Sequence, residues 1–236
     1  LMESSTSAVN WQPRNIAKRP GELLRQSMQH VARGADGILF FQWRASRAGA
    51  EKFHSGLVPH AGTDTRLWRE VMRLGSAREA VAEVAGSSAD NKVAILFDWN
   101  ARWACELDSH PSIDVRYLDR ARAFHAAVTD RGVGVDVIHP ETDLTPYSLI
   151  VVPTLYLASD AAAASVAAAA ARGATVVVTY FSGIVDEDDH IRLGGYPGAF
   201  RDLLGVRVEE FLPLRQGESV SLDDGTRADV WAEHLE

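Results

Sequence analysis

The chain has very little cysteine: Cys105 is the only one among 236 residues. A single thiol excludes a disulfide within the chain and a zinc site built from several cysteines. Scarce cysteine fits a reducing compartment, so we expect a cytoplasmic protein. We also expect it to need no cofactor.

Long apolar runs and excess positive charge are absent too. No stretch reaches the roughly 20 apolar residues that span a bilayer. The Ala-rich run at 161–171 is too short. Lys and Arg total 24 against 32 Asp and Glu, a formal net charge of -8. Nucleic acids and anionic membranes both bind proteins through clustered basic residues, so we expect neither as a main partner.

A glycine-rich phosphate loop is also lacking. The apolar strand expected at 93–97 is followed by the bulky segment DWNARW, where a phosphate would need bare backbone amides. We interpret this segment as a loop that also holds Cys105. Its neighbours Glu106 and Asp108 disfavour a thiolate. These absences argue against a nucleotide binder or a cysteine-dependent amidotransferase.

The first region that is present, residues 1–86, has a strand–helix–strand–helix pattern. Pro20 and Gly34 bracket a helix, and an apolar run at 37–43 has the length of a buried strand. A long polar loop follows, and then a helix begins after Asp64 or Thr65. Two such βα units cannot close a barrel, which needs eight.

A linker at 86–91 separates this region from a second one at 92–212. Strands are expected at 93–97, 133–138, 148–152 and 175–179, with helices at 115–131 and between Ser159 and Gly173. This alternation predicts a doubly wound, largely parallel α/β domain. The remainder, 217–236, carries the turn Asp223-Asp224-Gly225 and looks like a β element cut short.

Glu3 is the first candidate for chemistry. A carboxylate at the end of a short strand, followed by small hydroxyl residues and Trp11, suits a sugar-cleaving nucleophile beside an aromatic that packs on a sugar face. The alternative is a capping or surface glutamate, the commonest role of this residue type. No domain starts naturally inside an active-site strand. We therefore expect the C-terminal part of a longer enzyme.

The second candidate is the polar loop after the strand at 37–43. Glu51 and His54 are three residues apart, so on a helical turn they would face the same way and could share the hydroxyls of one sugar ring. The alternative is a salt-bridged loop with a solvated histidine. Catalytic zinc usually takes three protein ligands, so this pair leads us to predict no metal.

Two segments resemble glycoside hydrolase family 42, the bacterial β-galactosidases: residues 2–15, MESSTSAVNWQPRN, and residues 40–54, FFQWRASRAGAEKFH. In that family a TIM barrel precedes a flavodoxin-like, class I amidotransferase-like trimerisation domain and a small β domain. The resemblance implies an α/β chain whose residues 1–86 end the (β/α)8 catalytic barrel. It implies the trimerisation domain at 92–212 and the start of the C-terminal β domain at 217–236.

The resemblance also implies roles for individual residues. Glu3 matches the catalytic nucleophile, Trp11 an aromatic lining the sugar pocket, and Phe41 an apolar wall. Glu51 and His54 match a pair that hydrogen-bonds galactose hydroxyls. The family's acid/base glutamate has no counterpart here. The implied parent is a retaining enzyme that hydrolyses terminal non-reducing β-D-galactosides and is a homo-oligomer, expected to be a trimer.

Two other interpretations stay open. The chain by itself, lacking one of two carboxylates, is expected to be inactive, with exposed apolar faces around Leu39 and Phe41. It could then act as a non-catalytic oligomerisation module. A stand-alone amidotransferase-like enzyme or nucleotide binder is disfavoured, since Phe181 stands where such an enzyme places its elbow cysteine.

Overall fold

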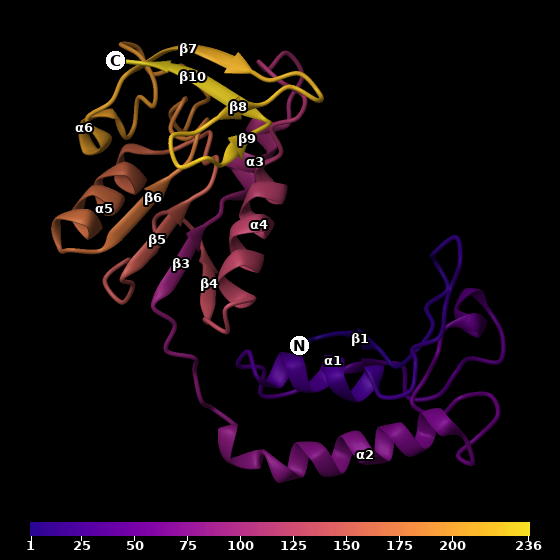
Figure 1. Ribbon diagram of the computed structural model, residues 1–236. Coiled ribbons are helices and arrows are strands. Elements are labelled where there is room, and N and C mark those ends of the chain that lie inside the picture. Colours follow the sequence, from indigo (N-terminus) through magenta and orange to yellow (C-terminus); the bar gives the residue numbers. More distant parts are fainter. The chain divides into compact units, whose positions relative to one another are not determined.

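The computed structural model describes all residues from 1 to 236. The chain forms two compact units, Leu1–Ala89 and Asp90–Glu236, which are indigo to purple and magenta to yellow in Figure 1. None of the helices is long and apolar enough to cross a membrane.

The first unit contains two short parallel strands, each followed by a helix. Strand β1 (Ser4–Ser5) pairs with β2 (Phe40–Phe41), with Ser4 opposite Phe40 and Ser5 opposite Phe41. Helix α1 (Glu22–Val31) forms the crossover between them, as parallel pairing requires. Helix α2 (Arg66–Ala80) follows β2 and packs against α1. The 3₁₀ turns are η1 (Ala50–Phe53) and η2 (Ala82–Val84).

Helix α2 begins where the sequence predicts. The hydroxyl of Thr65 accepts a hydrogen bond from the Trp68 backbone N–H at 3.3 Å, which satisfies one of the free donors of the first turn. One turn on, the buried Glu70 accepts from Arg66 at 2.9 Å and from the Gly21 backbone N–H at 2.8 Å. Glu70 therefore ties the start of α2 to the start of α1.

Strand β2 is shorter than the apolar run that predicted it. Only Phe40 and Phe41 form ladder pairs, because β1 is the sole neighbouring strand and itself contributes two residues. Before the ladder, the Leu39 N–H donates to the Leu1 carbonyl at 3.0 Å. The side chain of Leu39 is 60% exposed, in line with the expected apolar face, whereas Phe41 is half-buried.

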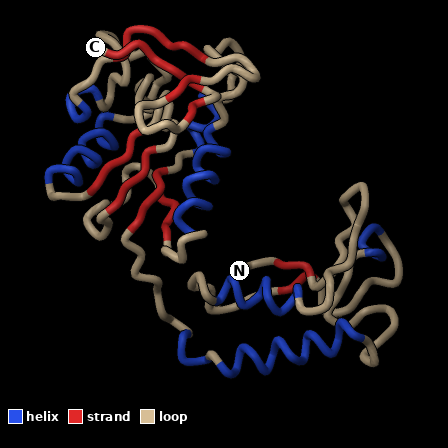
Figure 2. The backbone as a smooth tube through the Cα atoms, in the orientation of Figure 1, coloured by secondary structure: helices blue, strands red, loops and turns tan.

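The second unit is built on a four-stranded parallel sheet with the order β4-β3-β5-β6 (Figure 2). Its strands are β3 (Val93–Leu96), β4 (Val135–Ile138), β5 (Leu149–Val152) and β6 (Thr175–Val178). Helices α4 (Tyr117–Thr129) and α5 (Asp160–Ala171) cover opposite faces of this sheet (Figure 1). The Ser159 hydroxyl caps α5 by accepting from the Ala162 N–H, as predicted.

The segment after β3, expected to be a loop, is instead helix α3 (Trp99–Cys105). The Asp98 carboxylate caps it by accepting from the backbone N–H groups of Asn100 and Ala101, both at 3.1 Å. This cap compensates for the modest helix propensity of the aromatic residues that follow it. The expectation of a loop was therefore wrong, and its N-cap signal, Asp98, is visible in the sequence.

The end of the chain belongs to the second unit. After the short helix α6 (Arg201–Leu204), β7 (Val208–Pro213) pairs antiparallel with β10 (Trp231–Leu235), and β8 (Val220–Ser221) forms a hairpin with β9 (Arg227–Ala228). The predicted turn at 223–225 joins the two hairpin strands. Trp231 is 6% exposed and lies in the main core. Residues 217–236 are thus part of one compact unit with the sheet.

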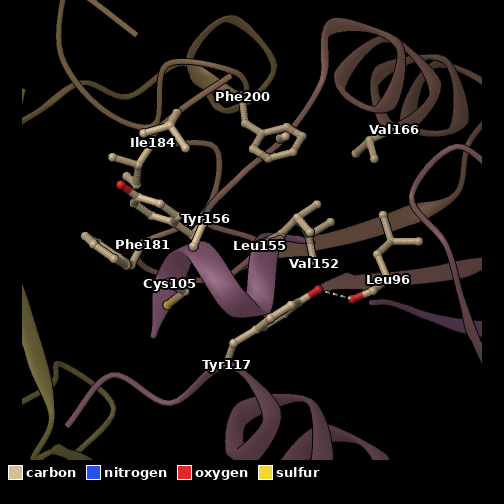
Figure 3. Close-up of a cluster of buried hydrophobic side chains, with 14 of the residues drawn as sticks. Leu96, Cys105, Tyr117, Val152, Leu155, Tyr156, Val166, Phe181, Ile184 and Phe200 are labelled. Carbon is tan, nitrogen blue, oxygen red and sulfur yellow. Dashed lines mark hydrogen bonds between the residues drawn. The ribbon is translucent and has the colours of Figure 1, made fainter. Parts of the chain in front are cut away.

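The main core lies between the sheet and α3, α5 and the C-terminal strands (Figure 3). The fully buried Tyr117 hydroxyl donates to the Leu96 carbonyl at 3.0 Å and accepts from the Asp98 N–H at 3.1 Å. Both polar functions of the phenol are therefore satisfied, as burial requires. Burial also raises the pKa of Tyr117 well above its usual value.

Candidate functional site

The loops that follow β1 and β2 are joined to each other in the first unit. Ser55 makes three of these contacts: its backbone N–H donates to the Ala8 carbonyl at 2.9 Å, and its hydroxyl accepts from the Thr6 hydroxyl at 3.0 Å and the Ser7 N–H at 2.8 Å. Parallel strands place their following loops at the same edge of a sheet. Residues far apart in sequence therefore meet here.

Three of the five predicted site residues are in ring contact. The His54 imidazole stacks on Trp11 with centroids 5.3 Å apart, and the ring of Phe41 lies edge-on to it at 4.9 Å. His54 is 1% exposed, whereas Trp11 is 62% exposed. The two aromatic rings thus hold the imidazole, while much of Trp11 stays open to pack on a ligand.

The backbone of Ser55 determines the tautomer of His54. The His54 Nδ1 atom lies 2.7 Å from the Ser55 carbonyl oxygen. A carbonyl only accepts, so Nδ1 carries the hydrogen, and in the neutral ring Nε2 is left as an acceptor. This nitrogen can receive a hydrogen bond from a hydroxyl group.

Glu51 and His54 contact different neighbours. Glu51 belongs to the 3₁₀ turn η1, which ends before His54, whose backbone is extended (φ −73°, ψ 136°). The His54 backbone N–H still donates to the Glu51 carbonyl at 3.0 Å, and the expected shared face of the two side chains stays a prediction. The Glu51 Oε2 atom accepts from the Asn10 Nδ2 group at 2.9 Å. Glu51 and His54 are thus linked through the neighbours Asn10 and Trp11.

The expected place of Glu3 at the end of a strand was wrong: Glu3 directly precedes the paired residues of β1, because only Ser4 and Ser5 find partners in β2. Side chains alternate along a strand, so Glu3 shares a face with Ser5, the ladder partner of Phe41. Glu3 is exposed, and neither a helix cap nor an ion pair uses it. Its carboxylate therefore has no ion-pair partner in this unit.

The second unit offers no activated nucleophile at the carboxyl edge of its sheet. Cys105 is buried in α3, and burial, with a smaller contribution from Glu106, raises the pKa of its thiol to about 12. Phe181 follows β6 with a positive φ of 58° and packs against Tyr156 and Trp231, with ring centroids 5.1 and 5.2 Å away. Aromatic rings thus pack together beyond the carboxyl ends of β5 and β6.

No group of three or more His, Cys, Asp or Glu side chains converges in the chain. The expected lack of a metal stays a prediction. Sequence reasoning undervalued Asn10 and missed Ser55, whose partners lie 40 or more positions away. The Asn10-Trp11 dipeptide alone carried no signal for this contact, which depends on the pairing of β1 with β2.

Known proteins resemble this chain over its whole length. The family model described as "Beta-galactosidase trimerisation domain" matches residues 91–236, and the model described as "Beta-galactosidase" matches residues 1–81. A β-galactosidase from Arthrobacter sp. is 63% identical over 235 residues and covers the whole chain. The β-galactosidase BgaB from a Geobacillus species is 46% identical over 214 residues, 90% of the chain.

Solved structures show the same relationship. The β-galactosidase of Bacillus circulans sp. alkalophilus matches the whole chain with a TM-score of 0.95 at 36% identity, and that of Rahnella sp. R3 with 0.92 at 37%. The chain spans about a third of its relatives: 34% and 32% of the two sequences, and 37% and 36% of the two structures. With one family model covering more than half of its length, the chain belongs to the β-galactosidases of glycoside hydrolase family 42.

Proposed function

We propose that this chain is the C-terminal part of a retaining β-galactosidase that hydrolyses terminal non-reducing β-D-galactosides. One observation carries the proposal: the loops after two paired parallel strands bring Trp11 and His54 into contact beside Phe41 of β2, with Glu3 unpaired on the Phe41 face. The relatives that cover the chain are β-galactosidases by name. We infer that the first unit is the end of a (β/α)8 barrel, whose active site is built by such loops.

In the proposed reaction, Glu3 attacks the anomeric carbon of the bound galactoside. A carbon–oxygen bond forms to the carboxylate while the bond to the aglycone breaks, and a second carboxylic acid protonates the departing oxygen. This chain does not supply that acid, which must come from another part of the enzyme. Water then attacks the galactosyl-enzyme with the same group as base, so galactose leaves with retained configuration.

The other site residues bind the sugar. Trp11 offers its exposed ring to the apolar face of galactose, and Phe41 forms an apolar wall beside the imidazole. The Nε2 atom of His54 and the carboxylate of Glu51 both accept hydrogen bonds from hydroxyls. Without a second carboxylate, the isolated chain is inactive in this proposal.

Hydrolysis of an aryl β-galactoside by the full-length enzyme tests the role of Glu3. Glu3→Gln should lose at least about 1,000-fold in kcat, since no covalent intermediate forms. Glu3→Ala in azide should regain turnover, with an α-galactosyl azide as the product. Glu79→Gln, an exposed glutamate of α2, is the matched control and should behave as wild type. Normal turnover by Glu3→Gln would refute the assignment.

A second function, homo-oligomerisation to a trimer, is proposed for the second unit. The match to a trimerisation domain supports it, and so does a series of rings that leads from the core to the surface. Buried Tyr117 stacks on Phe97 at 4.9 Å, Phe97 meets Trp99 at 5.2 Å, and Trp99 lies 6.3 Å from Trp103. Trp99 and Trp103 are 53% and 62% exposed. Exposed tryptophans mounted on a rigid core are typical interface anchors.

Sedimentation velocity of the full-length enzyme tests this function. Trp103→Ala should shift the distribution from trimer towards monomer at micromolar concentration, because one large apolar anchor is lost. The control Leu193→Ala removes an apolar side chain that is even more exposed, 87%, elsewhere in the second unit and should leave the trimer intact. A monomeric wild type would contradict the trimer itself. If Trp103→Ala remains a trimer, only the assignment of Trp99 and Trp103 to the interface is contradicted.

A further inference from the structure

The side-chain amide of Asn10 bridges the two loops of the site. Its Nδ2 group donates to the Ala50 carbonyl at 2.8 Å and to the Glu51 Oε2 atom at 2.9 Å. An amide nitrogen has two hydrogens, so both are used. The two acceptors are a backbone group and a carboxylate of the same 3₁₀ turn. One side chain thereby fixes both the position of the turn and the rotation of the Glu51 carboxylate.

This arrangement leaves one carboxylate oxygen of Glu51 available. Glu51 is half-buried, and no second hydrogen bond within the chain reaches its carboxylate. The next residue, Trp11, holds His54 in the same way through ring stacking. We propose that Asn10 is a positioning residue that orients Glu51 to accept a hydrogen bond from the sugar. The role rests on the proposed galactosidase function.

Asn10 is not needed to keep the two loops together. Ser55 joins them separately through Thr6, Ser7 and Ala8. Removal of the Asn10 amide therefore leaves the loops in place but frees the Glu51 carboxylate to rotate. A purely structural role would predict the opposite: a weakened fold and a loss of activity independent of Glu51.

The test is a kinetic double-mutant cycle in the full-length enzyme with an aryl β-galactoside. Asn10→Ala should lower kcat/KM about 10- to 100-fold, the range expected when a hydrogen bond to a charged group is lost. In a Glu51→Ala background the same substitution should cost less than about twofold, because its target is gone. Asn10→Asp keeps the shape of the side chain but places a second carboxylate beside that of Glu51. It should lower kcat/KM at least as much as Asn10→Ala does.

Asn15→Ala is the matched control. The Asn15 amide makes its two hydrogen bonds only with Gln12 of the same loop, so kcat/KM should stay within about twofold of wild type. Equal losses from Asn10→Ala in the wild-type and Glu51→Ala backgrounds would overturn the proposal, since Asn10 would then act elsewhere.

A second readout separates this proposal from the proposed function. If the wild-type enzyme hydrolyses no aryl β-galactoside, the galactosidase assignment fails, and thermal unfolding of the same four proteins still tests the contact. A Tm shift for the double variant smaller than the sum of the two single shifts would support coupling between Asn10 and Glu51. Strictly additive shifts would overturn it.

Discussion

Gly56 is the position where one added methyl group should disturb the candidate site most. A Cβ atom built there would lie 2.5 Å from the Ala45 nitrogen, 2.8 Å from the Arg44 carbonyl carbon and 3.1 Å from the Gln42 oxygen. All three are backbone atoms, which cannot swing aside as the end of a flexible side chain can. Gly56→Ala therefore has to separate two segments of main chain.

The cost follows from the hydrogen bonds that hold these segments together. Leu57 N–H donates to the Gln42 carbonyl at 2.7 Å, Val58 N–H to the Trp43 carbonyl at 2.9 Å, and Ala45 N–H to the Val58 carbonyl at 3.0 Å. Weakening these bonds and overpacking the site should lower the local free energy of opening by about 2–3 kcal/mol. His54, two residues before Gly56, should move with the segment and lose part of its contact with Phe41.

Hydrogen-exchange mass spectrometry of the full-length enzyme measures this opening directly. Peptides covering residues 42–58 should exchange about 30- to 150-fold faster in Gly56→Ala than in wild type. Gly75→Ala is the matched control, because nothing lies within 4 Å of its Cβ and the position is inside α2. It should leave these peptides unchanged and stabilise the helix by up to about 1 kcal/mol. Exchange in Gly56→Ala within threefold of wild type would refute the reasoning.

Three further predictions concern α3. Cys105 should resist iodoacetamide at pH 8 in the folded protein and react fully in denaturant, as peptide mass spectrometry would show. Because burial raises the pKa of the folded thiol from 9.0 to about 12, its stabilising effect is complete below pH 9 and declines above it. Wild type should lose about 2 kcal/mol more than Cys105→Ala between pH 7.5 and 10.5 in denaturant unfolding; parallel profiles would contradict this. Asp98→Ala should cost about 1 kcal/mol through the lost cap, while Asp98→Asn should cost little.

Helices were predictable where a local cap marks them. Thr65 and Ser159 begin α2 and α5 as expected, because a hydroxyl that accepts from the first turn is a short-range interaction. The same signal precedes α3 at Asp98, where the sequence analysis predicts a loop. The physical information for α3 is thus present in the sequence, as a carboxylate that accepts from the first turn of the helix.

Strand lengths were less predictable, because a strand exists only where a partner pairs with it. The apolar run at 37–43 has the length and composition of a buried strand, yet only Phe40 and Phe41 pair. Residues 93–97 carry a similar pattern, and there Val93–Leu96 lies between two neighbours and is buried throughout. The difference lies in the number of partners, which composition does not specify.

The site shows the same division between local and long-range information. The spacing of Glu51 and His54 predicts a shared face, and the local 3₁₀ turn joins the two residues through the hydrogen bond from the His54 N–H to the Glu51 carbonyl. What holds the two residues is the pairing of β1 with β2, which sets Asn10 against Glu51 and Trp11 against His54. The dipeptide Asn10-Trp11 in the loop after β1 thus positions both hydrogen-bond acceptors, Glu51 and His54, of the loop after β2. If the site binds galactose as proposed, substitutions at Asn10 and Trp11 should change recognition of different hydroxyls of the same sugar.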